Sequence, residues 1–193
     1  MKPALILASA SPRRRQLLRA WKIPFRVIFS RMHEPRPGRT PPVRYARRLA
    51  LAKANAVARQ VKVGWVLGAD TIVVAGRAIL GKPRSVAEAE RMLRTLSGSR
   101  HRVITAVALV DATTGRRRVA HATSVVTMRR LSDVERRRYA RRHLDKAGAY
   151  AVQDENDPVV TKIEGSYTNV VGLPKEVVLP LVRRVLRVTP RPG

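Results

Sequence analysis

One aspartate, Asp70, stands in the middle of the apolar segment VLGADTIVV, residues 66–74. A carboxylate inside a buried strand is costly to desolvate unless it is paired, hydrogen-bonded or bound to a metal ion. One reading is a buried ion pair with one of the many arginines of the chain. The other reading places Asp70 at the edge of a cleft, where it holds a divalent cation or accepts a proton from water. Both readings fit the sequence at this point.

A lysine, Lys53, falls on the apolar stripe of an expected helix. The apolar residues that recur with it at helical spacing are Val43, Ala46, Leu49, Ala50, Ala54 and Val57. Such a stripe faces the protein core. The Lys53 ammonium therefore either reaches solvent along its aliphatic stem or supplies positive charge to an anion in a cleft.

A second lysine, Lys82, belongs to GRAILGKP, residues 76–83. This segment matches the phosphate-binding pattern G-x-x-x-x-G-K-[ST] except at Pro83, where the hydroxyl that binds magnesium is missing. The sequence therefore argues against a P-loop nucleoside triphosphatase. Lys82 can still contact a phosphate group as a point charge.

The segment LASASPRRRQLL joins an apolar run to three consecutive arginines. Ser11 followed by Pro12 is typical of a helix start, because the hydroxyl caps the first turn and proline presets the backbone angle. Ser9, Ser11 and the free amides of the helix start could hold phosphate oxygens. Arg13 and Arg14 either add positive charge to that site or are solvated charges on the helix.

Strand and helix patterns alternate along the chain and predict an α/β protein with a mixed sheet. Capping-box spacings, Ser85 with Glu88 and Ser132 with Glu135, mark two helix starts. Pro180 lies inside the apolar final helix and is expected to kink or split it. The expected strands are residues 4–8, 23–29, 66–74, 103–110 and 119–128, and the other expected helices begin near residues 12 and 42.

The composition excludes several classes of protein. There is no cysteine, which removes disulfides, thiolate metal sites and a cysteine nucleophile together. No apolar run approaches the roughly 18 residues that span a bilayer, and the first apolar stretch stops at Ala8, too early for a signal peptide. We therefore expect a cytoplasmic protein without a membrane segment.

The net charge is strongly positive, with 40 basic and 13 acidic residues and a formal charge of +27. One explanation is an anionic partner, which includes nonspecific binding to nucleic acid. The other is a bias toward arginine that decorates most exposed faces of the protein. Charge alone does not identify a fold.

Seven motifs in order carry a resemblance that covers nearly the whole chain. They are LASASPRRRQLL, LAKA, VLGADTIVV, LGKP, LSGSRHRVITAVALV, DKAGAYAVQ and IEGSYTNVVGLP. Together they resemble the Maf family of nucleoside triphosphate pyrophosphatases. KAGAYAVQ followed by GSYTNVVGLP is more similar to the branch that acts on dTTP and UTP than to the branch that acts on 7-methyl-GTP.

The resemblance implies a single domain over residues 1–193 with a nucleotide-binding cleft between sheet and helices, similar to inosine triphosphatases. It implies hydrolysis between the α and β phosphates with a divalent cation, Mg²⁺ or Mn²⁺, and a homodimer. Asp70 is then the proton acceptor and a metal ligand, with Glu34 as the second acid near the metal. Glu34 could instead pair with Arg36 or Arg39 on the surface.

The remaining implied site residues bind the substrate. Those associated with base selection are Arg13, Thr71 and Gln153, and those suited to the phosphates are Ser9, Ser11, Arg14, Lys53 and Lys82. Two alternatives to this function remain. One is a pyrophosphatase of the same family that acts on 7-methyl-GTP, and the other is a basic protein, without enzymatic activity, that binds nucleic acid or regulates division. The low aromatic content of 4% offers no base-stacking platform for the latter.

Overall fold

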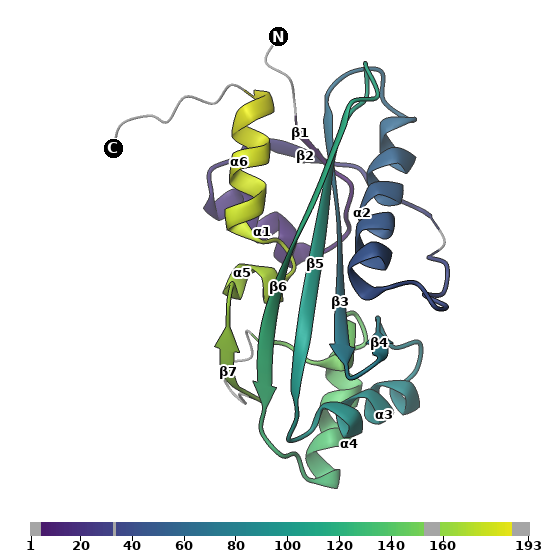
Figure 1. Cartoon of the computed structure of the whole chain (residues 1–193), viewed down its shortest axis with the longest axis vertical. Helices are drawn as coiled ribbons and strands as arrows, with labels where there is room; N and C mark the ends of the chain where they lie inside the picture. The colour runs from purple at the N-terminus through teal and green to yellow at the C-terminus, as the bar shows by residue number, and fades with distance from the viewer. Residues whose placement is uncertain (1–4, 33, 153–158, 187–193) are drawn as a thin grey trace.

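The computed structural model describes residues 5–32, 34–152 and 159–186 (Figure 1). Strands and helices alternate along the first half of the chain, as the sequence predicts. The strands are β1 (Leu5–Leu7), β2 (Phe25–Val27), β3 (Trp65–Ala75), β4 (Ala78–Leu80), β5 (Arg100–Asp111), β6 (Arg117–Met128) and β7 (Val160–Glu164). The helices are α1 (Pro12–Ala20), α2 (Pro42–Ala58), α3 (Val86–Leu96), α4 (Asp133–Arg142), the 3₁₀ turn η1 (Ala147–Ala149), α5 (Tyr167–Val171) and α6 (Lys175–Leu186).

The seven strands form one mixed sheet with the order β2-β1-β3-β5-β6-β7, and β4 pairs with β3. Strand β1 lies parallel to both β2 and β3, whereas the other pairings are antiparallel. Short turns join the antiparallel pairs β3–β4 and β5–β6, whereas β5 reaches β3 after α3 and β7 reaches β6 after α4. The parallel pairs need the crossover helices α1 and α2. The predicted α/β class with a mixed sheet flanked by helices is confirmed.

Helices cover both faces of the sheet (Figure 1). Because side chains alternate along a strand, Val66 of β3 faces the core under α2, and Leu67 faces the core that α1 and α6 share. A third core lies where α3 and α4 pack on the lower part of the sheet in Figure 1. The central strands are thus buried on two sides, which explains their nearly continuous apolar sequence.

Strand β3 has a gap in its pairing along one edge. On that edge β1 pairs with Trp65, Val66 and Leu67, and β4 pairs with Val73, Val74 and Ala75. Strand β5 occupies the opposite edge throughout. The stretch from residue 68 to residue 72, which contains the aspartate, therefore has no strand beside it on the first edge among the described residues. A break in a sheet of this kind leaves room for a cavity.

Three local predictions were only partly correct. Ser132 and Glu135 form a full capping box, whereas Ser85 caps α3 without the return bond from Glu88. The Ser11 hydroxyl makes no cap hydrogen bond at α1. Pro180 does not split the last helix, since α6 is continuous from residue 175 to residue 186. Pro180 is exposed, so water can reach the carbonyl that its missing N–H leaves unpaired. None of the described helices is long and apolar enough to cross a membrane.

Candidate active site

A cavity of about 820 Å³ opens at the gap in β3. Its wall comes from β3, β4, the segments that follow β1 and β2, the start of α1, one side of α2, α3 and η1. Seven basic and four acidic side chains of the described residues line it, which leaves an excess of three positive charges. The rest of the wall includes apolar side chains, among them Met92, Val103, Tyr150 and Val170. A cavity with a cationic part and an apolar part suits a ligand that joins phosphates to a flat ring.

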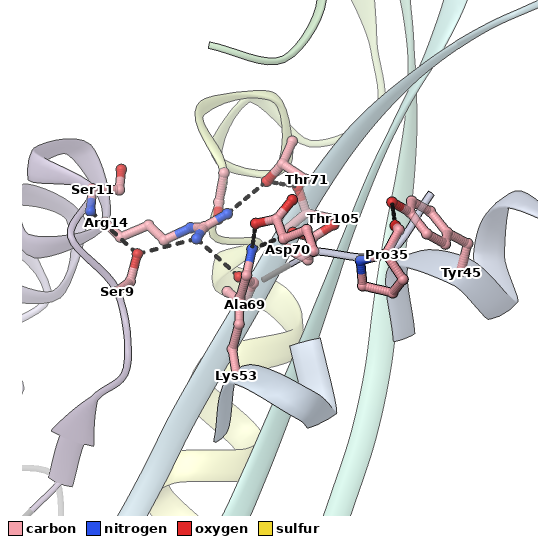
Figure 2. Close-up of polar contacts among 12 residues, drawn as sticks. Ser9, Ser11, Arg14, Pro35, Tyr45, Lys53, Ala69, Asp70, Thr71 and Thr105 are labelled. Carbon is pink, nitrogen blue, oxygen red and sulfur yellow. Dashed lines mark hydrogen bonds and ion pairs between the residues drawn. The ribbon is translucent and has the colours of Figure 1, made fainter. Parts of the chain in front are cut away.

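Asp70 and Lys53 meet at the gap (Figure 2). The Nζ of Lys53 lies 2.6 Å from Oδ1 of Asp70 and 2.6 Å from Oε1 of Glu34. Asp70 and Lys53 are largely buried, and Glu34 is half exposed. The partner of Asp70 is thus a lysine and not an arginine, and Glu34 pairs with Lys53 instead of Arg36 or Arg39. One ammonium bridges two carboxylates that come from different segments.

Burial and charge act differently on the two carboxylates. Burial raises the pKa of Asp70, and the Lys53 charge and hydrogen bond offset only part of that effect. Burial also raises the pKa of Glu34, but Lys53, Lys82 and Arg14 together outweigh it and leave that pKa below its usual value. Asp70 is therefore the more basic of the two carboxylates. A raised pKa improves a carboxylate as a proton acceptor, provided that it stays ionised at the working pH.

The contact between Asp70 and Lys53 depends on Gly68. Both Asp70 and Gly68 face α2, because they are two residues apart on β3. A Cβ at Gly68 would clash with the carbonyl oxygen of Ala50 and lie 2.7 Å from the backbone nitrogen of Ala54. Only glycine lets α2 approach the strand so closely. The close approach brings the Lys53 side chain within reach of the aspartate.

We expect Gly68→Ala to impair both stability and activity. The added methyl must push the α2 backbone away, and overpacking of this kind costs about 1–3 kcal/mol. The displacement separates Lys53 from Asp70, so nucleotide turnover should also fall. Urea denaturation and a turnover assay on the same samples measure the two effects. Gly81→Ala is the stability control, since its Cβ would meet nothing within 4 Å. Equal stability of both variants and the parent would contradict the role of Gly68.

Arg14 lies against the open edge of β3, in the same gap. Its Nε donates to the carbonyl of Gly172 at 2.8 Å, and its Nη1 donates to the carbonyl of Ala69 at 2.9 Å and to Oγ of Ser9 at 3.1 Å. Its Nη2 donates to Oγ1 of Thr71 at 3.0 Å (Figure 2). Arg14 thus serves an open strand edge as a neighbouring strand would, and it is not a solvated helix charge. Four of its five N–H groups are used in this way.

The hydroxyl of Ser9 has one hydrogen-bonding position left. It accepts hydrogen bonds from Arg14 and from the backbone N–H of Ser11, at 3.1 and 3.2 Å. A serine hydroxyl has two acceptor positions and one proton, so only the O–H donor of Ser9 is left. Ser9 lines the cavity, where this donor suits a phosphate oxygen.

The hydroxyl of Thr71, in contrast to that of Ser9, has an acceptor position left and no donor. Oγ1 of Thr105 donates its proton to the carbonyl of Asn169 at 2.8 Å, so the 2.9 Å contact between the two threonine hydroxyls uses the proton of Thr71. Thr71 also accepts from Arg14. What remains to Thr71 is a single acceptor position, and Thr71 lines the cavity.

Arg13 and Lys82 are among the other cations that line the cavity. Burial lowers the pKa of Lys82, and the charges of Arg14 and Lys53 lower it further. Burial also lowers the pKa of Arg13, whereas Asp145 raises it. Cations gathered in a partly buried cavity repel one another. An anion bound among them would relieve that repulsion.

The carboxylates also suit a hard divalent cation. Oδ2 of Asp70 is buried and has no hydrogen-bond partner among the described residues. Glu34 adds a second carboxylate on the cavity wall. Mg²⁺ is commonly held by one or two carboxylates together with substrate phosphates, so this donor set fits it. Within the described residues no group of three or more histidine, aspartate or glutamate side chains forms a complete site by itself.

The structure brings nearly all of the predicted site residues to one cavity. Those that line it are Ser9, Ser11, Arg13, Arg14, Glu34, Lys53, Asp70, Thr71 and Lys82. Gln153 lies outside the described residues. Two lining residues were not predicted from the sequence. One is Asp145, the first residue of the motif DKAGAYAVQ, and the other is Ser30, whose buried Oγ has no partner among the described residues. Ser30 follows β2 as Ser9 follows β1. Because the carboxyl ends of parallel strands meet at one edge of a sheet, this position could have identified Ser30 as a candidate.

Known proteins resemble this chain over most of its length. The family model described as Maf-like protein matches residues 4–185. A protein of Moorella thermoacetica named dTTP/UTP pyrophosphatase is 49% identical over 88% of this chain and 89% of its own. A protein of Thermomicrobium roseum with the same name is 51% identical over 88% of this chain and 78% of its own. A solved HAM1 protein of Coxiella burnetii aligns with a TM-score of 0.44 and 20% identity, over 67% of this chain and 74% of its own.

Proposed function

This chain belongs to the Maf family, and we propose that it hydrolyses dTTP and UTP to the nucleoside monophosphate and pyrophosphate. The observation that carries the proposal is Asp70, which lines a cavity with excess positive charge and whose buried Oδ2 has no hydrogen-bond partner among the described residues. The names of the relatives support the choice of substrates. The chain is a hydrolase that acts on phosphoanhydride bonds.

Asp70 is the proton acceptor in this proposal. Lys53 holds Oδ1, which leaves Oδ2 to accept a proton from the attacking water. Water attacks the α phosphorus, the anhydride bond to the β phosphate breaks, and pyrophosphate leaves. Lys53, Lys82, Arg13 and the Ser9 hydroxyl stabilise the negative charge on the phosphates. We propose Asp70 and Glu34 as ligands of Mg²⁺ or Mn²⁺, which when bound neutralises phosphate charge and polarises the reacting phosphoryl group.

The acceptor position of Thr71 supports the choice of base. Uracil and thymine carry an N–H donor at ring position 3, where cytosine has an unprotonated nitrogen. Thr71 can accept a hydrogen bond from this N–H, but it has no proton left to donate to the unprotonated N3 of cytosine. A site that leaves polar atoms unpaired with the wrong base discriminates strongly against it. Arg13 is proposed as a second base-selecting residue.

Pyrophosphate release from dTTP, UTP, CTP and 7-methyl-GTP tests the proposal. With Mg²⁺ or Mn²⁺ we expect dTTP and UTP to be hydrolysed fastest and CTP more slowly, and chelation of the metal to stop turnover. Fastest release from 7-methyl-GTP would assign the chain to the other branch of the family. Release from none of the four would leave the non-enzymatic alternative. The homodimer and the cytoplasmic location stay predictions, to be checked by light scattering and cell fractionation.

A further inference from the structure

A second cavity, of about 710 Å³, lies over the outer face of α2. Four arginines line it, Arg39, Arg44, Arg47 and Arg48, and we call it the arginine groove. Its floor includes Leu51 and Val119. It shares no described lining residue with the candidate active site. We propose that the arginine groove binds the sugar-phosphate backbone of nucleic acid, independently of base sequence.

The arginine groove faces away from the active site. At 100° per residue, Lys53 lies about 180° around α2 from Arg44. Arg47, Arg48 and Leu51 follow Arg44 at positions i+3, i+4 and i+7, so they share its face of the helix. One helix therefore presents a lysine to the candidate active site and a row of arginines to the opposite side. A ligand in the arginine groove would not compete with the nucleotide.

The four arginines have no acidic partners within residues 5–32, 34–152 and 159–186. None of the ion pairs among the described residues includes Arg39, Arg44, Arg47 or Arg48. Arg47 donates to the backbone carbonyl of Val119 at 3.1 Å, and the Arg48 guanidinium lies 5.6 Å from the centre of the Tyr45 ring. These contacts orient the guanidinium groups without neutralising them. Like charges at this spacing on a helix repel, and a bound anion would remove that cost.

Phosphate groups match the donors of these guanidinium groups. A guanidinium offers parallel N–H donors that match two oxygens of one phosphate. Arg44 and Arg48 are about 6 Å apart along the helix axis, and a nucleic-acid strand carries one charge per about 3.4 Å of its axis. Successive arginines can thus meet different phosphates of one strand. Tyr45 is buried, and no exposed aromatic side chain among the described residues lines the groove for base stacking.

Fluorescence anisotropy of a short labelled single-stranded DNA, followed over a range of KCl concentrations, tests the proposal. We expect Arg44→Ala/Arg48→Ala to raise the Kd about tenfold in low salt and to reduce the slope of log K against log [KCl] by about 1.4. Arg137→Ala/Arg141→Ala is the matched control, because it removes two exposed arginines at the same i, i+4 spacing from α4. This control should change the Kd less than twofold, and both variants should keep full dTTP turnover.

Three outcomes would overturn the proposal. Equal weakening by both double variants would mean that net charge and not the arginine groove binds the DNA. Displacement of the DNA by a saturating nucleotide analogue would place it in the active site. Tight binding of inorganic triphosphate without any DNA binding would identify a site for free phosphates. Arg39→Ala/Arg44→Ala serves as a second groove variant if the melting temperature of the first one falls.

Discussion

Asp70→Asn is expected to lower the turnover of dTTP by between about a hundredfold and ten-thousandfold, the usual contribution of a positioned general base. Asparagine keeps the size and shape of the side chain but cannot accept the proton of water. The variant should fold normally. Burial opposes the charged form of Asp70, and a neutral side chain avoids that cost, while Lys53 keeps Glu34 as its partner. Pyrophosphate release measures turnover, and thermal melting measures stability.

A surface carboxylate provides the control for this prediction. Glu90 pairs only weakly with Arg94, at 3.8 Å, so Glu90→Gln removes the same charge without touching the cavity. Binding of a non-hydrolysable dTTP analogue should stay within a few-fold of the parent in both variants. If Asp70→Asn retained more than a tenth of the parental rate, another group would have to be the proton acceptor.

Lys53→Met is expected to damage both stability and activity. It leaves the buried Asp70 and the neighbouring Glu34 without their shared cation, and an unpaired buried charge costs about 3 kcal/mol or more. For a chain of this size that loss corresponds to a fall in Tm of roughly 6–12 °C. Turnover should fall with it, because Asp70 then takes up a proton and no longer accepts one from water. Thermal melting and pyrophosphate release give the two readouts.

A double variant separates the two effects of Lys53. Lys53→Met/Asp70→Asn has no buried charge to leave unpaired, so it should recover most of the lost Tm and remain inactive. Lys62→Met is the matched control, since Lys62 is exposed and the change in net charge is the same. A double variant that melts as low as Lys53→Met would show that the lysine stabilises the fold by packing instead of by charge.

Local sequence signals predicted much of the fold. Periodicity and capping residues predicted most of the helices and the long strands, because those signals depend on neighbours in the chain. Asp70 in an apolar strand and Lys53 in an apolar helix stripe each indicated that the charged side chain has a polar or charged partner or reaches a cleft. The structure adds that they meet each other. Sequence spacing alone could not pair them, since the approach of α2 to β3 depends on packing at Gly68.

The gap in the sheet could not be read from the sequence. It arises because β1 and β4 share one edge of β3 and are both short, which is a matter of long-range pairing. For the same reason the sequence could not show that Arg14, and not Arg13, lies along the open edge of β3. The two are adjacent on a helix start, and only the position of the open strand edge decides which of them enters it. The short strand β2, residues 25–27, was likewise predicted too long.

The contacts of Arg14 also bear on how the protein is made. Its partner Gly172 follows it by 158 residues, so a growing chain cannot form this hydrogen bond until Gly172 has been synthesised. At synthesis rates of about 5–20 residues per second, Arg14 waits roughly 8–32 s for that partner. Until then Arg14, which lies against the open edge of β3, lacks its hydrogen bond to the carbonyl of Gly172. The surroundings of Asp70 are therefore complete only after Gly172 has been made, and a chain that stops before Gly172 would carry Asp70 without this Arg14 contact.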